Sequence, residues 1–400
     1  MVARQAQAPR VEEPLRNRSP MDLTLFIFFL ILLLAFANGT NDVSKAIATL
    51  VGSGIANYGT AIAWGTLWTM VGAAASAFVA SAMVKTFSSS FIELDLVIPA
   101  VLAPAVLCGA ILWVLFASKT GLPVSTTHAL TGSLVGGGVL AFGIDGLIWS
   151  TVSKKIVLPL LLSPFLSFVL SMLFHPLMAM ITKRWEGLCV CIMPSHRALM
   201  TIDPQGCTRT LFQAGGSGMP VAAVPSQCDQ AGLHGPTIGL DSLHWLSSGL
   251  ASLARGTNDA PKIAAMLLLG STMTTWPSPT WHILAFAGVA IAMGIGSYWG
   301  GQRVTEILAE RVTKMNHAEG LSANLTTSSL VLLSGTFGLP VSTTHISSSA
   351  IIGIGLLRGT GSLRWTTVRD IVLAWLVTIP AAACLACAAY FLLSRALQTF

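Results

Sequence analysis

The sequence predicts an all-α polytopic membrane protein made of two homologous repeats with broken or re-entrant helices. Two observations lead to this fold class: an unusually apolar composition, and two polar motifs that each occur twice at one spacing. Of the 400 residues, 53% are hydrophobic and only 10% are charged, and the mean hydropathy is +0.73. Soluble domains carry about 25% charged residues, so this composition is typical of a chain embedded in lipid.

Long apolar stretches occur along most of the chain. A membrane-spanning helix needs roughly 20 mostly apolar residues, and several stretches are too short or too rich in Gly and Pro to cross alone. We therefore expect about 10–12 helical spans, some of them broken or re-entrant. The stretches lie near residues 21–38, 60–84, 97–118, 129–149, 156–181, 243–254, 262–272, 281–300, 325–338, 346–357 and 371–393.

The net charge of +6 comes from cations in the N-terminal arm and in the connectors between apolar stretches. Cations beside membrane spans usually contact anionic lipid, so the lipid bilayer is the expected partner and nucleic acid is not. Four of the seven cysteines lie in the polar connector without the paired spacing of a structural zinc site. Cys384 and Cys387 form a CxxC pair inside an apolar helix, where packing is the better interpretation. We therefore expect neither a metal centre nor a cofactor.

The duplication divides the chain into two halves. GTND occurs at 39–42 and 256–259, and GLPVSTTH occurs at 121–128 and 338–345, so both motifs recur after the same interval. This common offset predicts a polar N-terminal arm (1–20), two transmembrane repeats and a polar connector between them. An inverted arrangement follows if an odd number of crossings separates the copies. The repeats are 21–182 and 238–400, and the connector is 183–237.

Each GTND copy brings charge into an apolar helix. Asp42 and Lys45 are three residues apart, as are Asp259 and Lys262, so each pair shares one helix face. A charge at the bilayer centre costs roughly 2.5–3.5 kcal/mol, and such residues usually mark a functional site. The alternative is a structural salt bridge that holds a broken helix, but two equivalent copies favour a shared central cavity.

The residues beside these charges are expected to interrupt the helix. Gly39 and Gly256 should loosen it, so that Asn41 and Asn258 can bond backbone groups left unpaired by an unwound turn.

GLPVSTTH predicts the start of a new helix, because Pro is well placed in a first turn. Its hydroxyls would then lie at a helix N-terminus, where free N–H groups and the helix dipole suit an anion. Ordinary capping by Ser or Thr is the alternative. His128 and His345 could relay protons or bond a nearby backbone carbonyl. The six hydroxyl residues are Ser125, Thr126, Thr127, Ser342, Thr343 and Thr344.

Together the motifs predict an oxyanion site. Hydrogen phosphate can donate a hydrogen bond to Asp42 or Asp259, whereas sulfate has no proton to give and would be repelled. Phosphate is therefore favoured, and a sulfate or other oxyanion permease and an anion channel remain as alternatives. An enzyme is disfavoured because Ser125 and His128 share one helix and no catalytic triad emerges.

At these residues the sequence resembles the inorganic phosphate transporter (PiT) family. The family signature is close to G-A-N-D-V-A-N-A in each half, with G-L-P-V-S-T-T-H downstream, and the resemblance covers almost the whole chain. It implies an all-helical protein with inverted repeats, a possible homodimer, in a bacterial inner membrane. It implies phosphate import with Na⁺ or H⁺, by symport with alternating access. The resemblance also implies the site residues. Phosphate and the coupling ion would be bound by the Ser and Thr residues of both GLPVSTTH copies together with Asn41, Asp42, Asn258 and Asp259.

The chain departs from this pattern at several positions. Lys45 and Lys262 stand where the signature has its second Asn, Trp68 and Thr69 lie where an acid is often found, and Asn324 replaces another acid. Fewer carboxylates and added ammonium groups reduce the capacity for Na⁺, and an ammonium could stand in for a bound cation. We expect Asp42, Lys45, Asp259, Lys262 and Asn324 to serve the coupling ion or the charge balance.

Overall fold

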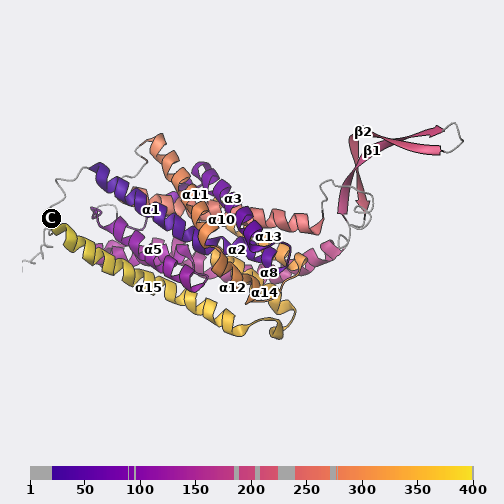
Figure 1. Ribbon diagram of the computed structural model, residues 1–400. Coiled ribbons are helices and arrows are strands. Elements are labelled where there is room, and N and C mark those ends of the chain that lie inside the picture. The colour runs from indigo at the N-terminus through magenta and orange to yellow at the C-terminus, as the bar shows by residue number, and fades with distance from the viewer. Residues whose placement is uncertain are drawn as a thin grey trace, which may run out of the picture.

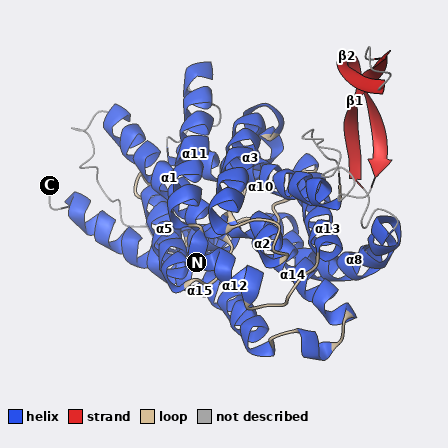
Figure 2. Cartoon of the chain, turned by 45° about the vertical axis from the view of Figure 1, so that its right-hand side comes forward, coloured by secondary structure: helices blue, strands red, loops and turns tan. Residues whose placement is uncertain are grey.

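The structure is a computed structural model that shows a body of packed helices and one projecting β-hairpin (Figures 1 and 2). The predicted N-terminal arm lies almost wholly outside the described residues, as do parts of the predicted connector. The described residues are 20–88, 90–93, 96–183, 189–202, 208–223, 239–270, 276 and 278–398.

The first repeat begins with a long helix and ends with another. Its principal helices are α1 (Pro20–Asp42), α2 (Ser44–Gly52), α3 (Tyr58–Val79), α4 (Ser81–Ser88), α5 (Leu102–Thr120), α6 (Thr126–Phe142) and α8 (Leu158–Lys183). Between α6 and α8 lie short helical turns, namely η2 (Ile144–Gly146), α7 (Trp149–Thr151) and the π-helical η3 (Val152–Val157).

The second repeat follows the same order with fewer interruptions. Its helices are α10 (Leu240–Gly270), α11 (Pro279–Gly300), α12 (Gln302–Glu310), α13 (His317–Thr336), α14 (Thr343–Leu357), the short η4 (Thr360–Ser362) and α15 (Trp365–Gln398). Within the described ranges, ten helices of 15 or more residues are present, at the lower end of the predicted number of spans.

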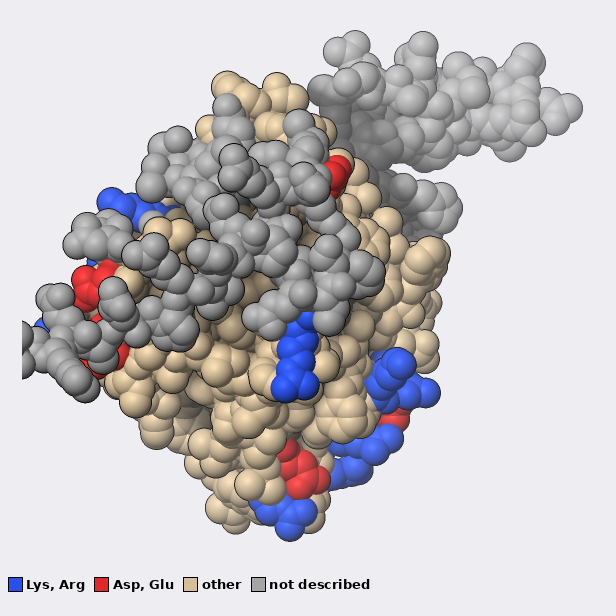
Figure 3. All heavy atoms as spheres, turned by 90° about the vertical axis from the view of Figure 1, so that its left-hand side faces the viewer, with Lys and Arg blue, Asp and Glu red and all other residues tan. Residues whose placement is uncertain are grey.

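Six of the described segments are long and apolar enough to cross a membrane, which confirms the predicted membrane fold. They are Asp22–Gly52, Tyr58–Val79, Leu102–Thr120, Trp149–Lys183, Pro279–Gly300 and Trp365–Ala396. Large apolar side chains such as Phe78 and Phe165 point outward from these segments. Figure 3 shows that the charged side chains on one face form small groups separated by uncharged surface.

Both GLPVSTTH motifs lie at a true break between helices. Gly121 (φ 80°) follows α5 and Gly338 (φ 63°) follows α13, each in the left-handed region that glycine favours. An extended Leu-Pro-Val segment follows, and Thr126 or Thr343 then opens the next helix. The Gly-Leu-Pro sequence of each motif therefore predicted these breaks correctly.

The GTND motifs behave differently from the prediction. Gly39 lies inside α1, which is interrupted only later, at Val43, while Gly256 lies inside the continuous α10. A Cβ on Gly39 would stand 2.2 Å from the Met293 carbonyl oxygen, and one on Gly256 would stand 2.3 Å from that of Thr69. The expectation that these glycines unwind the helix is therefore wrong: they allow two helices to approach closely.

The two repeats interdigitate. The helix α1 packs on α11 of the other repeat, and α10 packs on α3 in return; α6 packs on α15, and α14 packs on α8. Gly296 approaches Phe36 of α1, and Gly72 approaches Leu253 of α10, with the same closeness of backbones. Because Phe36 and Leu253 are separated by the same interval as the motif copies, the equivalent helices use equivalent contacts.

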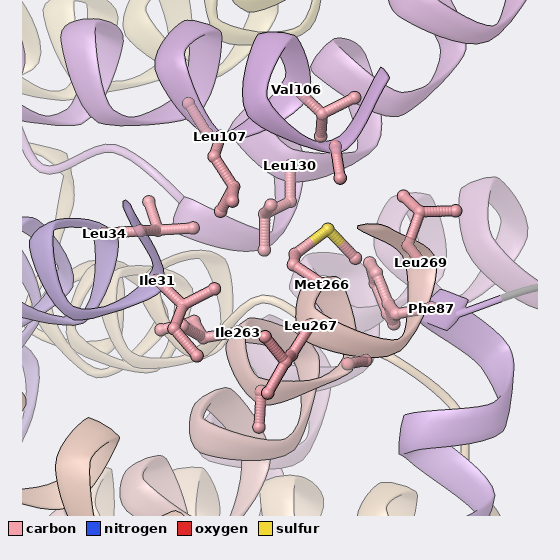
Figure 4. Packing of buried hydrophobic residues seen from close by; sticks show 14 of the residues in the cluster. Ile31, Leu34, Phe87, Val106, Leu107, Leu130, Ile263, Met266, Leu267 and Leu269 are labelled. Carbon is pink, nitrogen blue, oxygen red and sulfur yellow. The ribbon is translucent and has the colours of Figure 1, made fainter. Parts of the chain in front are cut away.

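The helix α10 runs antiparallel to the α1–α2 segment. The end of α10 meets the start of α1, since a Cβ on Gly270 would lie 2.3 Å from Ile27 Cδ1. Near the other end, Ser248 Oγ donates to the Ala46 carbonyl oxygen at 2.8 Å. The N-terminal half of α1 and the C-terminal half of α10 contribute to the largest apolar core, together with α5, α6 and α11, and Ile31 lies beside Ile263 and Leu267 there (Figure 4).

The connector contains a hairpin that the sequence analysis did not predict. Strand β1 (Cys189–Ile202) pairs antiparallel with β2 (Thr208–Ala223), with an irregularity between Pro194 and Ser195. The hairpin extends away from the helices in both ribbon views (Figures 1 and 2).

Candidate functional site

The duplicated motifs meet in one buried cluster where α1, α2 and α10 meet the breaks before α6 and α14. Asp42, Lys45, Asp259 and Lys262 form the charged part of this cluster, and none of these residues is more than 2% exposed. Each Lys lies three residues after its Asp and forms a salt bridge with it. The predicted pairing of the charges on one helix face is confirmed.

Each lysine also binds the extended segment of its own repeat. Lys45 contacts the Asp42 carboxylate and donates to the Val124 carbonyl oxygen at 3.1 Å. Lys262 donates to Asp259 Oδ1 at 3.3 Å and to the Val341 carbonyl oxygen at 3.1 Å. The two valines occupy the same place in GLPVSTTH, so both helix breaks are tied to a charge pair.

Threonines join the two repeats across the cluster. Thr344 Oγ1 donates to the Val124 carbonyl oxygen at 2.8 Å, and Thr127 Oγ1 donates to that of Val341 at 3.4 Å. Lys262 Nζ donates to Thr127 Oγ1 at 2.8 Å. The threonine contacts are reciprocal, because each repeat supplies the hydroxyl for the other repeat's carbonyl.

Asn38 lies at the centre of the cluster, although the sequence analysis did not include it among the site residues. Its Nδ2 lies within hydrogen-bond distance of Asp42 Oδ2 (2.9 Å), Thr126 Oγ1 (3.0 Å) and Asp259 Oδ2 (3.2 Å). A single amide therefore bridges the carboxylates of both repeats. Its position directly before GTND in an apolar helix was the available signal.

The two GLPVSTTH serines cap helices. Ser125 Oγ accepts a hydrogen bond from the His128 N–H, and Ser342 Oγ accepts one from the His345 N–H, both at 3.2 Å. Ordinary capping, the alternative from the sequence, is thus observed for both serines. The neighbouring Thr343 is buried at the start of α14. A role of these residues in anion binding stays a prediction.

The histidines of the two motifs lie against each other. The ring centroids of His128 and His345 are 4.2 Å apart, and His345 also lies 4.1 Å from the Trp375 ring. His128 Nδ1 and His345 Nε2 have no hydrogen-bond partner among the residues that the structure describes. A proton relay through this pair stays a prediction.

The predicted asparagines differ in their surroundings. Asn41 holds the first helix break, since its Nδ2 donates to the Leu122 carbonyl oxygen at 3.0 Å and its Oδ1 accepts from the Val124 N–H at 3.2 Å. Asn258 Nδ2 donates to Asp259 Oδ1 at 2.8 Å and to the Val341 carbonyl oxygen at 3.2 Å.

Asn324 lies on α13, apart from the motif residues. Its Oδ1 accepts from Thr49 at 3.1 Å, and its Nδ2 donates to Ser247 at 3.4 Å. The structure therefore gives it contacts with α2 and α10 rather than with the charge pairs.

The sequence analysis did not identify a further buried cation, Arg255. It directly precedes Gly256, just as Asn38 directly precedes Gly39, so Arg255 and Asn38 occupy equivalent positions in the repeats. Its Nη2 donates to Thr69 Oγ1 at 2.7 Å. With Arg255 included, the two carboxylates face three cationic groups, and the buried cluster carries one excess positive charge when all are ionised. Such a cluster favours an anion over a metal cation.

Known proteins are similar to this chain over most of its length. The model of a family described as the phosphate transporter family matches residues 38–386. A Mycobacterium leprae protein named "Probable low-affinity inorganic phosphate transporter" is 29% identical over 381 residues, covering 93% of this chain and 79% of that protein. A Mycobacterium tuberculosis protein of the same name is 28% identical over 373 residues, covering 90% and 76% respectively.

A solved structure called "The sodium-dependent phosphate transporter" shares the fold, with a TM-score of 0.73 and 23% sequence identity. The alignment covers 94% of this chain and 100% of that one. The family match spans both copies of GTND and both copies of GLPVSTTH, and it leaves out only the chain ends. The chain is therefore an integral membrane protein that belongs to the phosphate transporter family.

Proposed function

We propose that this protein imports inorganic phosphate together with Na⁺ or H⁺, by symport with alternating access. The observation that carries the proposal is the buried cluster, in which both repeats supply charges and hydroxyls around one point. Asn38 joins the two carboxylates there, and Thr127 and Thr344 cross between the repeats. The names of the relatives, which describe phosphate transporters, support the same substrate.

The chemistry of the cluster suits a protonated oxyanion. Lys45, Lys262 and the threonine hydroxyls are donors for phosphate oxygens, and charge-assisted hydrogen bonds of this kind are the stronger ones. Asp42 and Asp259 can accept the proton of hydrogen phosphate, whereas sulfate has no proton to donate and would be repelled by them. Phosphate is therefore the better substrate, with sulfate as the second candidate.

Alternating access fits the packing of the repeats. The antiparallel course of α10 beside α1–α2 is the relation expected for inverted repeats, which place the substrate site at their interface. The cluster lies at this interface, next to the apolar core that includes Ile263 (Figure 4). We infer that opening requires the repeats to move relative to one another.

Coupling follows from the membrane potential. Moving a dianion into an inside-negative cell costs about 4.6 kcal/mol at 100 mV, so at least two cations must accompany it for accumulation. The charged residues Asp42, Lys45, Asp259 and Lys262 are the groups that would balance them.

Uptake by proteoliposomes tests the proposal. Labelled phosphate should accumulate above its equilibrium level when either a Na⁺ or a proton gradient is imposed, and unlabelled phosphate should compete better than sulfate. Accumulation that ignores both gradients would contradict symport. Equilibration without accumulation would instead identify a channel.

A further inference from the structure

Arg255 is a buried cation without a salt-bridge partner among the described residues. It lies on α10, one turn before Asp259, and its side chain is 1% exposed. No carboxylate lies within 4.0 Å of its guanidinium in the part of the chain that the structure describes. It is thus unlike Lys45 and Lys262, which are each paired.

The guanidinium uses only part of its hydrogen-bonding capacity. Nη2 donates to Thr69 Oγ1 of α3 at 2.7 Å and to Ser297 Oγ of α11 at 3.4 Å. Nε and Nη1 have no partner among the described residues. Asp42 and Asp259 attract the guanidinium electrostatically from beyond contact distance.

Such an arrangement is costly for a residue with only a structural role. Burying an unpaired charge is strongly unfavourable, and each buried donor without an acceptor adds to that cost. At the equivalent position of the first repeat, the neutral Asn38 makes close contacts with both carboxylates. Packing at this position therefore does not require a positive charge. A bound anionic ligand would explain why the second repeat has an arginine here.

The surroundings of Arg255 connect it to the cluster. His244, Ser248, Ser252, Arg255 and Asp259 recur every three or four residues, so they share one face of α10. All five are buried, and Ser252 Oγ, one turn before Arg255, also has no partner within the described ranges. The free donors of the guanidinium thus belong to a polar face that reaches the carboxylate of Asp259.

We propose that Arg255 is a ligand of the transported oxyanion, which supplies the acceptors for Nε and Nη1. This inference rests on the proposed function, because it assigns a new binding residue to the same site. An anion bound there would neutralise the excess positive charge of the cluster. Thr69 and Ser297 hold the guanidinium in place for this contact.

Thermal melting of the purified full-length chain in detergent tests the proposal, because a ligand raises the melting temperature of the protein that binds it. Phosphate, sulfate and chloride are titrated separately. We expect Arg255→Gln to need about tenfold more phosphate than the wild type for the same shift, since one charge-assisted contact is worth roughly tenfold in affinity. Without phosphate, Arg255→Gln should melt no lower than the wild type. Arg311→Gln, which removes an exposed cation, is the matched control.

A structural role gives the opposite pattern: a lower melting temperature without phosphate and an undiminished response to it. That result overturns the inference. If Arg255→Gln does not fold, Arg255→Asn decides, because it introduces the neutral residue that the first repeat has at the equivalent position, Asn38. An undiminished response of that variant to phosphate also overturns the inference. If chloride raises the melting temperature of the wild type as much as phosphate does, the ligand is a halide rather than an oxyanion.

Proteoliposome uptake separates this inference from the proposed function. Failure of the wild type to transport phosphate would contradict the function, while an Arg255-dependent response to sulfate would still support an oxyanion ligand. Normal phosphate transport by the wild type with an unaltered response of Arg255→Gln would contradict the inference alone.

Discussion

The helices α1 and α10 carry equivalent motifs, but the faces that lead to those motifs differ in chemistry. Ile27, Ile31 and Ala35 precede Asn38 on α1, whereas His244, Ser248 and Ser252 stand at the equivalent positions before Arg255 on α10. All of these side chains are buried. The charged motif residues are therefore the same in both repeats, whereas the helix faces that precede them differ.

This difference gives the two sides of the site different roles. The apolar face of α1 packs into the largest core, together with Ile263 and Leu267 from the far half of α10 (Figure 4). The polar face of α10 packs on α2 and α3 and contains donors without partners, such as Ser252 Oγ and Arg255 Nη1, within the described residues. The apolar core lies on one side of the site, while the other side has donor groups that an anion or water can bind.

The charge pairs at the shared centre offer the strongest test. We expect Asp42→Asn to reduce phosphate uptake at least about 100-fold and to lower the melting temperature, because breaking a buried ion pair costs about 3–5 kcal/mol. Asp259→Asn should also lower the melting temperature, since Asp259 pairs with Lys262 at 3.3 Å. Uptake and melting are measured together.

Asp370→Asn is the control for these two variants, because Asp370 pairs with Arg369 at the exposed surface. Normal phosphate transport by Asp42→Asn would refute the assignment of the site.

The lysines sharpen the comparison, because Lys262 alone also donates to the other repeat through Thr127. We expect Lys262→Asn to weaken phosphate affinity about tenfold, as loss of one charge-assisted contact would. Lys45→Asn should alter the Na⁺ and proton dependence of uptake more than phosphate affinity, since its bonds stay within its own repeat. Uptake over a range of phosphate and Na⁺ concentrations distinguishes the two, and identical profiles would contradict the asymmetry.

The GTND glycines are the point at which α1 and α10 are most alike. Gly39→Ala and Gly256→Ala should each cost about 1–3 kcal/mol, because the added methyl group meets the backbone of α11 or α3. Gly335→Ala serves as the control, since a Cβ there meets no atom within 4 Å. Melting temperatures in detergent provide the measurement, and a Gly39→Ala variant as stable as Gly335→Ala would show that the close approach is not required.

Much of this arrangement could be predicted from the sequence. The common offset of the two motif pairs predicted the two repeats, the Gly-Pro pairs predicted the breaks before α6 and α14, and the three-residue spacing predicted the salt bridges. All of these features depend on local sequence or on repetition. Local signals of this kind are visible without knowledge of the packing.

The remaining features depend on contacts between segments far apart in the chain. The role of Gly39 depends on Met293, and that of Gly256 depends on Thr69, and no periodicity in the sequence connects these residues. Arg255 was missed for another reason. A search for identical residues in the two repeats passes over a position that holds Asn in one copy and Arg in the other.

The smallest expected effect concerns Ser252, whose hydroxyl has no hydrogen-bond partner among the described residues. Ser252→Ala places on α10 the residue that α1 has at the equivalent position, Ala35. We expect the melting temperature to stay unchanged, because no hydrogen bond of this hydroxyl within the described part of the chain is lost. Phosphate uptake should fall about two- to tenfold if the hydroxyl binds the passing anion, which corresponds to one ordinary hydrogen bond.

Ser248→Ala is the counterpart, because Ser248 Oγ already donates to the Ala46 carbonyl oxygen. Its loss should lower stability by about 0.5–1.5 kcal/mol and affect uptake less than Ser252→Ala does. Uptake and melting therefore separate a hydroxyl that holds helices together from one that is kept for a ligand. If Ser252→Ala transports phosphate at the wild-type rate, the polar face of α10 serves only in packing. The faces of α1 and α10 that precede the motifs would then differ in composition without differing in function.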